Sequence, residues 1–221
     1  MNDTVPPSRA AILLVQLGTP DKPEVPEVRR YLREFLSDRR VVEQSPLIWW
    51  PILYSVVLTR RPKESAEKYR SIWTKAGSPL LVNTKLVAEA LQDELNKRGR
   101  QVEVVWAMRY GNPSMVDALR DLRDRGFSRI VVLPMYPQYS AATSGTVFDV
   151  IAREFLQWRS IPALRFLQSF HDDPGYIAAV AESIRHSWRQ SEAGKPEKLI
   201  FSFHGLPQSC VDQGDPYVKQ C

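Results

Sequence analysis

Short apolar runs alternate with amphipathic stretches along most of the chain. The runs cover residues 10–17, 102–108, 129–135 and 163–167, and a segment of helical character follows each of them. Runs of this length are typical of strands buried on both faces of a parallel sheet. Strands that alternate with helices through short connections form βαβ units with right-handed crossovers. The pattern therefore predicts an α/β fold in which helices flank a parallel sheet.

Helix start signals occur between these strands. Residues 25–35 and 60–74 have amphipathic helical spacing, and Ser78 followed by Pro79 indicates the N-cap and first residue of a helix over 80–98. Asn112-Pro113 and Asp173-Pro174 give the same signal for helices that end near residues 125 and 190. A further helix is expected near 146–158.

Residues 46–58 form an unusual stretch that is apolar around most of the helical circumference and carries Trp49, Trp50 and Tyr54. One interpretation is a helix buried in the core. The other is an exposed apolar lip at the mouth of a pocket, or a patch that touches lipid. Adjacent tryptophans favour an interface, because the indole ring has an apolar body and a polar N–H.

The last apolar run, 198–203, predicts a buried strand that stops at His204, because Gly205 and Pro207 prevent its continuation. Ligands of open α/β sheets bind at the carboxyl ends of the strands. His204 is therefore a candidate functional residue, and a histidine that merely follows a strand is the alternative. Other predicted strand ends carry aromatic, hydroxyl and guanidinium groups, which this topology gathers at one edge of the sheet.

The polar stretch 191–197 is the best candidate for a domain boundary. We expect a first α/β domain over residues 1–192 and the truncated start of a second over 193–221. The second part contains one predicted strand and the beginnings of helices, and one βα unit cannot build a sheet core of its own.

Charge and cysteine content narrow the function classes. The 221 residues carry a formal net charge of +5, with basic and acidic residues interleaved, which fits an anionic small molecule or a membrane surface better than nucleic acid. The two cysteines, Cys210 and Cys221, exclude a disulfide framework or a four-cysteine metal site within this chain and fit a cytoplasmic location. The sequence has no signal-peptide pattern, no apolar run of roughly 20 residues and no dinucleotide-binding glycines.

Four motifs resemble ferrochelatase, the terminal enzyme of haem synthesis. They are LVQLGTP near the start, WAMRYGNP, PMYPQYS followed by TSG, and SFHGLP with GDPY about ten residues on. They occur in the family's order and at compatible spacings, from about residue 10 to the last residue. The resemblance implies a Rossmann-like chelatase fold and a lyase that inserts Fe²⁺ into a porphyrin without ATP.

The resemblance also implies site residues. His204 matches the histidine that binds metal and accepts a proton, together with a glutamate that this chain does not contain. Porphyrin contacts are expected from residues under the macrocycle centre, facing the ring, in the pocket wall and at the propionate edge: Leu17, Arg109, Tyr110, Tyr136, Arg61, Tyr69 and Ser78. For Tyr69 and Ser78 the alternative is structural, since a helix-face tyrosine and an N-cap serine need no function.

The resemblance leads to a choice of porphyrin. Residues 47–58 are apolar and aromatic and would cover the pocket mouth, which favours protoporphyrin IX over coproporphyrin. Leu17, where some relatives have tyrosine, favours the same porphyrin. The apolar stretch also suggests peripheral membrane contact. Ala141 stands where one type of [2Fe–2S] site has its first cysteine, so no such cluster is expected. The alternatives are a porphyrin-binding module without catalysis, or a related chelatase for cobalt and another tetrapyrrole.

Overall fold

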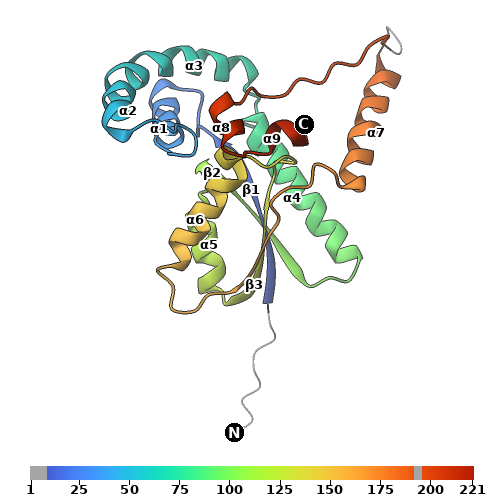
Figure 1. Ribbon diagram of the computed structural model, residues 1–221. Helices are drawn as coiled ribbons and strands as arrows, with labels where there is room; N and C mark the ends of the chain where they lie inside the picture. The colour runs from blue at the N-terminus through green and yellow to red at the C-terminus, as the bar shows by residue number, and fades with distance from the viewer. Residues whose placement is uncertain (1–8, 192–195) are drawn as a thin grey trace. The chain divides into compact units, whose positions relative to one another are not determined.

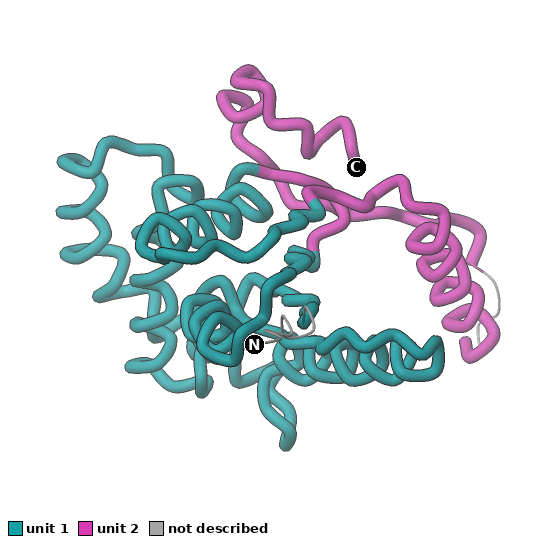
Figure 2. Tube along the Cα trace, turned by 90° about the horizontal axis from the view of Figure 1, so that it is seen from below, with its two compact units in different colours: residues 1–135, 141–167 teal, residues 136–140, 168–221 magenta. Residues whose placement is uncertain are grey.

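The computed structural model describes residues 9–191 and 196–221, which form two compact units. The sheet unit comprises the described residues of 1–135 together with 141–167, and the tail unit comprises those of 136–140 and 168–221 (Figure 2). The predicted domain boundary at 192/193 falls outside the described residues, so that division remains a prediction.

The sheet unit is built on four parallel strands. They are β1 (Arg9–Thr19), β2 (Val102–Gly111), β3 (Phe127–Pro134) and β4 (Ala163–Phe166), in the order β2-β1-β3-β4. The four strands predicted in this region are confirmed. The first two extend further than their apolar runs, because Gly18 still pairs with Tyr110 and Thr19 with Gly111. Gly18 makes this possible: its φ is +115°, and a Cβ there would lie 1.8 Å from the Tyr110 carbonyl oxygen.

Helices cover both faces of the sheet (Figure 1). The α4 helix packs on β1 and β2, whereas α5 packs against β1, β2 and β3 and also contacts α6. In the sheet unit the helices are α1 (Val25–Leu36), α2 (Pro46–Ile52), the π-helix η1 (Leu53–Val57), α3 (Leu58–Ile72), α4 (Pro79–Lys97), α5 (Met115–Asp124), the π-helix η2 (Ala141–Gly145) and α6 (Thr146–Phe155). The tail unit contains α7 (Pro174–Gln190), α8 (Gln208–Asp212) and α9 (Tyr217–Gln220).

The core of the sheet unit consists of the first three apolar runs and the apolar faces of the helices that pack on them. The fourth run is only half-buried or exposed along β4, so its predicted burial on both faces is wrong. The fully or nearly fully buried side chains of the core include Leu13, Leu14, Val15, Ala107, Met108, Leu119, Leu122, Ile130, Val132 and Ile151. Each of the valine, leucine, isoleucine and methionine side chains contributes about 1.5–3 kcal/mol when it leaves water. Removal of apolar surface from water therefore holds the strands in register and the helices against them.

One predicted helix start is wrong. Asn112 was expected to cap the helix that follows β2, but α5 begins at Met115 and its N-cap is Ser114, whose hydroxyl accepts from the Asp117 N–H at 3.1 Å. Asn112 instead donates its side-chain amide to Asp21 at 3.0 Å. The starts of α4 at Pro79 and α7 at Pro174 are confirmed, although the Ser78 side chain makes no capping hydrogen bond.

The strand predicted over residues 198–203 is also wrong. The main chain there is irregular, and the apolar side chains are exposed, Ile200 to 85%. A strand requires a neighbouring strand to accept its hydrogen bonds. The described part of the tail unit contains no strand, so this segment has no such neighbour.

Candidate functional site

The carboxyl ends of β1 and β2 bring three predicted site residues to adjacent strands. Leu17 lies half-buried near the end of β1, beside Arg109 and Tyr110 near the end of β2. The edge is the one expected for ligands of a parallel sheet. The predicted position of these residues at the ends of β1 and β2 is therefore confirmed, and their contact with porphyrin stays a prediction.

The partner of Arg109 and Tyr110 is Asp38, just beyond the end of α1. Its Oδ2 accepts hydrogen bonds from Nη2 of Arg109, from the Tyr110 hydroxyl at 2.9 Å and from the Thr146 hydroxyl at 2.8 Å. Its Oδ1 accepts from the main-chain N–H of Arg40 at 2.8 Å. The Arg109 and Asp38 side chains are only 9% and 11% exposed, and Tyr110 has no exposed surface. The result is a buried, charge-balanced cluster beneath the edge of the sheet.

Electrostatics keep the cluster ionised. Burial alone would raise the pKa of Asp38, but hydrogen bonds from the Arg40 N–H, Thr146 and Tyr110, with the charge of Arg109, lower that pKa below its usual range. Burial raises the pKa of Tyr110 far above that of an exposed tyrosine, so its phenol stays neutral and donates to Asp38. The Arg109 charge is thus largely compensated inside the protein.

The cluster continues toward the surface through a second ion pair. The guanidinium of Arg40 binds Asp149 of α6 with two hydrogen bonds, at 2.5 and 2.8 Å. A pocket of about 530 Å³ lies over this region, and its lining includes Asp38, Arg109, Asp149 and Trp50 of α2. The segment after α1 therefore joins the sheet edge, α6 and the start of the apolar stretch.

Three other predicted residues lie on or after α3. Arg61 is exposed, and Ser78 is buried. Tyr69 packs edge-on against Tyr31 with 6.3 Å between ring centroids, and burial raises its pKa although a hydrogen bond with Tyr31 opposes that shift. No hydrogen bond or ion pair within the described residues connects these three to Arg109 or Tyr110.

The tail unit brings two of the sequence motifs together. In the YPQYS segment the Ser140 hydroxyl donates to Asp215 of the GDPY segment at 2.9 Å, and the Tyr139 N–H donates to Gln220 at 2.7 Å. The half-buried Tyr136 begins the same segment. Residues far apart in the chain therefore form one locally connected structure around α9.

His204 is exposed within this unit. Its Nδ1 lies 2.6 Å from the carbonyl oxygen of Gly205. A carbonyl oxygen only accepts, so this contact places the ring proton on Nδ1 and leaves the lone pair on Nε2. No group of three or more His, Cys, Asp or Glu side chains in the described parts of the chain is arranged to hold a metal.

Comparison with known proteins decides the family. The ferrochelatase family model matches residues 9–221. The chain belongs to the ferrochelatase family. It is 54% identical over 214 residues to a ferrochelatase of Methylococcus capsulatus, covering 97% of this chain and 64% of that protein. It is 50% identical over 216 residues to one of Aromatoleum aromaticum, covering 97% and 59%, and 49% identical over 213 residues to "Ferrochelatase 2" of Shewanella oneidensis, covering 96% and 64%.

The chain thus spans about 60% of the length of these ferrochelatase relatives. None of the relatives named here carries another chelatase's name, so the comparisons do not favour the cobalt alternative. The family resemblance and the α/β fold predicted from sequence are both confirmed.

The apolar stretch takes the exposed form of its two interpretations. We define the apolar lip as the exposed side chains of α2 and η1: Leu47, Ile48, Trp50, Ile52, Tyr54 and Val56. Leu47 is 89% exposed and Trp50 56%, whereas Leu53 and Leu58 are buried. Trp49 is half-buried and its indole N–H donates to the Leu36 carbonyl at 2.7 Å. No helix in the described part of the chain is long and apolar enough to cross a membrane.

Proposed function

We propose that this chain forms part of an enzyme that inserts Fe²⁺ into protoporphyrin IX to give protohaem, the last step of haem biosynthesis. Membership of the ferrochelatase family over residues 9–221 carries this proposal. The arrangement of Leu17, Arg109 and Tyr110 at the ligand-binding edge of a parallel sheet supports it. Iron and porphyrin are the substrates in this reaction.

His204 is proposed to bind the metal and to accept a proton. Insertion forms bonds from iron to the porphyrin nitrogens and releases the two pyrrole protons. A neutral imidazole suits both tasks, since its free nitrogen lone pair can ligate iron or accept a proton. The contact of Nδ1 with the Gly205 carbonyl supports this role by leaving Nε2 as the basic atom.

The remaining residues are proposed to form the porphyrin pocket. Leu17 would lie under the macrocycle centre, with Tyr136 in the pocket wall and Tyr69 and Ser78 near the ring edge. The exposed guanidinium of Arg61 is a suitable partner for a propionate. Arg109 already pairs with Asp38, so we assign Arg109 and Tyr110 to a stiff wall that helps bend the macrocycle.

The apolar lip underlies the choice of protoporphyrin IX. Burying the two additional propionates of coproporphyrin against apolar side chains would cost several kcal/mol. An apolar porphyrin edge instead gains about 25 cal/mol for each Å² removed from water. We further propose a cytoplasmic protein whose residues 47–58 contact a membrane peripherally, where a poorly soluble porphyrin would be available. We expect no nucleotide and no [2Fe–2S] cluster of the type considered above.

The test measures Fe²⁺ insertion through loss of the free-base porphyrin spectrum. The full-length protein should turn over and prefer protoporphyrin in kcat/KM, and His204→Ala in that protein should abolish turnover. His186→Ala, which changes an exposed histidine of α7, is the matched control and should retain activity.

Full activity of His204→Ala would exclude the role of His204, and a clear preference for coproporphyrin would exclude the choice of substrate. Porphyrin binding without insertion by the 221-residue chain would support the binding-module alternative for this chain.

A further inference from the structure

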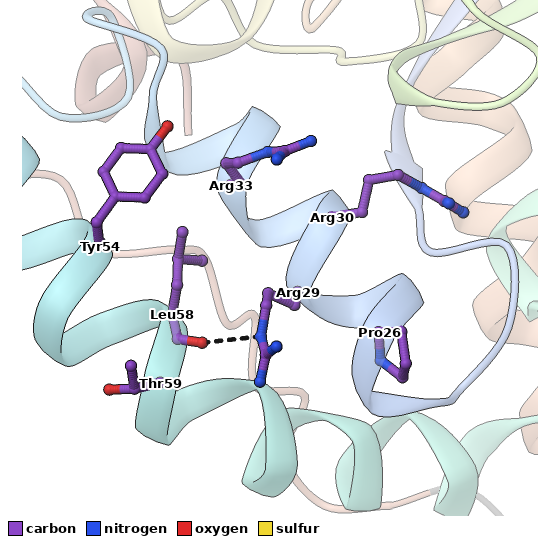
Figure 3. Close-up of a pocket in the computed structure, with 7 residues that line it drawn as sticks. All are labelled: Pro26, Arg29, Arg30, Arg33, Tyr54, Leu58 and Thr59. Carbon is purple, nitrogen blue, oxygen red and sulfur yellow. Dashed lines mark hydrogen bonds between the residues drawn. The ribbon is translucent and has the colours of Figure 1, made fainter.

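A groove separates α1 from η1 and the start of α3, with a volume of about 440 Å³ (Figure 3). Three arginines of α1 line one side, and Tyr54, Leu58 and Thr59 line the other. The groove is distinct from the Asp38 cluster, since none of its lining residues takes part in those hydrogen bonds. Three of its lining residues are arginines and none is acidic, so its chemistry favours an anion.

Two of these arginines retain unused hydrogen-bond donors. The Arg30 guanidinium donates to Asp21. Among the described residues the Arg29 side chain donates only its Nε, to the Leu58 carbonyl at 3.1 Å. Figure 3 shows that bond as a dashed line and Arg33 extended along α1. The main-chain carbonyl of Arg33 accepts from the Ser37 N–H, but its side chain makes no hydrogen bond or ion pair with any described residue, so turning that side chain toward the groove breaks no bond. Both Nη atoms of Arg29, the guanidinium of Arg33 and the Tyr54 hydroxyl are available to a ligand.

The groove adjoins the apolar lip. Tyr54 belongs to both, because this residue is 53% exposed among the lip residues and also lines the groove. Exposed apolar side chains beside basic groups match a phospholipid, whose acyl chains lie next to a charged phosphate. A free phosphate would use only the basic half of this surface.

We propose that the groove binds the phosphate of an anionic phospholipid when the apolar lip contacts a membrane. This inference rests on the proposed membrane contact and adds a lipid preference to it. An arginine close to an anionic membrane surface strengthens binding about fivefold, so the pair Arg29 and Arg33 accounts for about 25-fold. The lip then supplies binding to any bilayer, and the groove supplies preference for an anionic one.

The experiment is co-sedimentation of the 221-residue chain with vesicles of phosphatidylcholine, with and without phosphatidylglycerol. We expect phosphatidylglycerol to strengthen wild-type binding, and Arg29→Gln/Arg33→Gln to remove about 25-fold of that gain. The matched control is Arg159→Gln/Arg165→Gln, which removes the same charge from exposed positions elsewhere in the sheet unit and should retain the gain. Arg33→Gln alone removes no side-chain hydrogen bond or ion pair to the described residues. It should weaken binding to phosphatidylglycerol vesicles about fivefold without a change in stability.

Several outcomes would overturn the proposal. If both double variants lost the same part of the phosphatidylglycerol gain, net charge alone would attract the chain to the membrane. If the wild-type chain bound both kinds of vesicle equally well, membrane contact by the lip would be supported and phosphate binding in the groove would be excluded. If it bound neither kind, both the lip contact and the groove site would be excluded. If Arg29→Gln/Arg33→Gln weakened porphyrin binding and left vesicle binding unchanged, the groove would hold propionates instead.

Discussion

The buried carboxylate of Asp38 gives the sharpest prediction. Asp38→Asn keeps the size of the side chain and removes its charge. The variant leaves the guanidinium of Arg109 buried at 9% exposure without a counter-charge. It also weakens the acceptor used by the Tyr110 and Thr146 hydroxyls.

The size of the effect follows from this burial. Removing one partner of a buried ion pair costs about 3–5 kcal/mol, because the remaining charge stays desolvated. In a chain of this length each kcal/mol lowers Tm by about 2–4 °C, so the expected decrease in Tm is about 10 °C. Asp149→Asn is the matched control. In its ion pair the Arg40 side chain is 40% exposed and the Asp149 side chain 31%, and such exposed pairs contribute about 0–1 kcal/mol.

Thermal unfolding followed by circular dichroism at neutral pH measures both variants. A double variant, Asp38→Asn/Arg109→Met, should recover part of the lost stability because it removes the uncompensated charge. If Asp38→Asn and Asp149→Asn lowered Tm equally, the argument that burial makes the Asp38 pair different would be refuted.

The pH dependence checks the same reasoning with a known sign. The pKa of Asp38 is lower in the folded protein than in the unfolded chain, where it is near 3.9. Its stabilisation is therefore complete above about pH 4 and is lost as the pH falls through the folded pKa. The difference in Tm between wild type and Asp38→Asn should therefore become smaller as the pH falls below about 4.

Two further predictions use matched positions. Gly18→Ala should prevent folding, because its Cβ would meet the Tyr110 carbonyl oxygen at 1.8 Å, whereas Gly126→Ala, also at positive φ but with open space, should cost only about 1–2 kcal/mol. Similar melting of the two variants would contradict the close approach of β1 and β2. Trp49→Ser should lower Tm through loss of its hydrogen bond, and Trp50→Ser should change stability by less than about 0.5 kcal/mol but weaken vesicle binding. Unfolding of Trp50→Ser would show that the lip is part of the core.

Sequence patterns predicted the parts of the fold that depend on local burial. The apolar runs before Leu17 and Arg109 marked β1 and β2, because a strand covered on both faces needs apolar side chains at nearly every position. The Asp173-Pro174 start of α7 was equally local, since the cap and the helix it begins are adjacent in the chain.

The same reasoning missed Asp38 and misassigned residues 198–203. The side-chain partners of Asp38 lie 71, 72 and 108 positions away, and no short motif links an aspartate after a helix to residues at that separation. Residues 198–203 have the composition of a buried strand, but composition does not reveal whether a neighbouring strand is present. The apolar pattern indicates that a segment suits a buried strand, but only the structure shows whether another strand lies beside it.

The irregular segment before His204 has a practical consequence for handling the chain. Residues 199–203 expose Leu199, Ile200, Phe201 and Phe203 and make no main-chain hydrogen bond to the main chain of other described residues. Unpaired N–H and C=O groups beside apolar side chains are a template for strand addition between molecules. The 221-residue chain should therefore self-associate as its concentration rises, through this segment. Ile200 is the most exposed of the four, and the Ile200→Lys variant of the chain should remain monodisperse in light scattering.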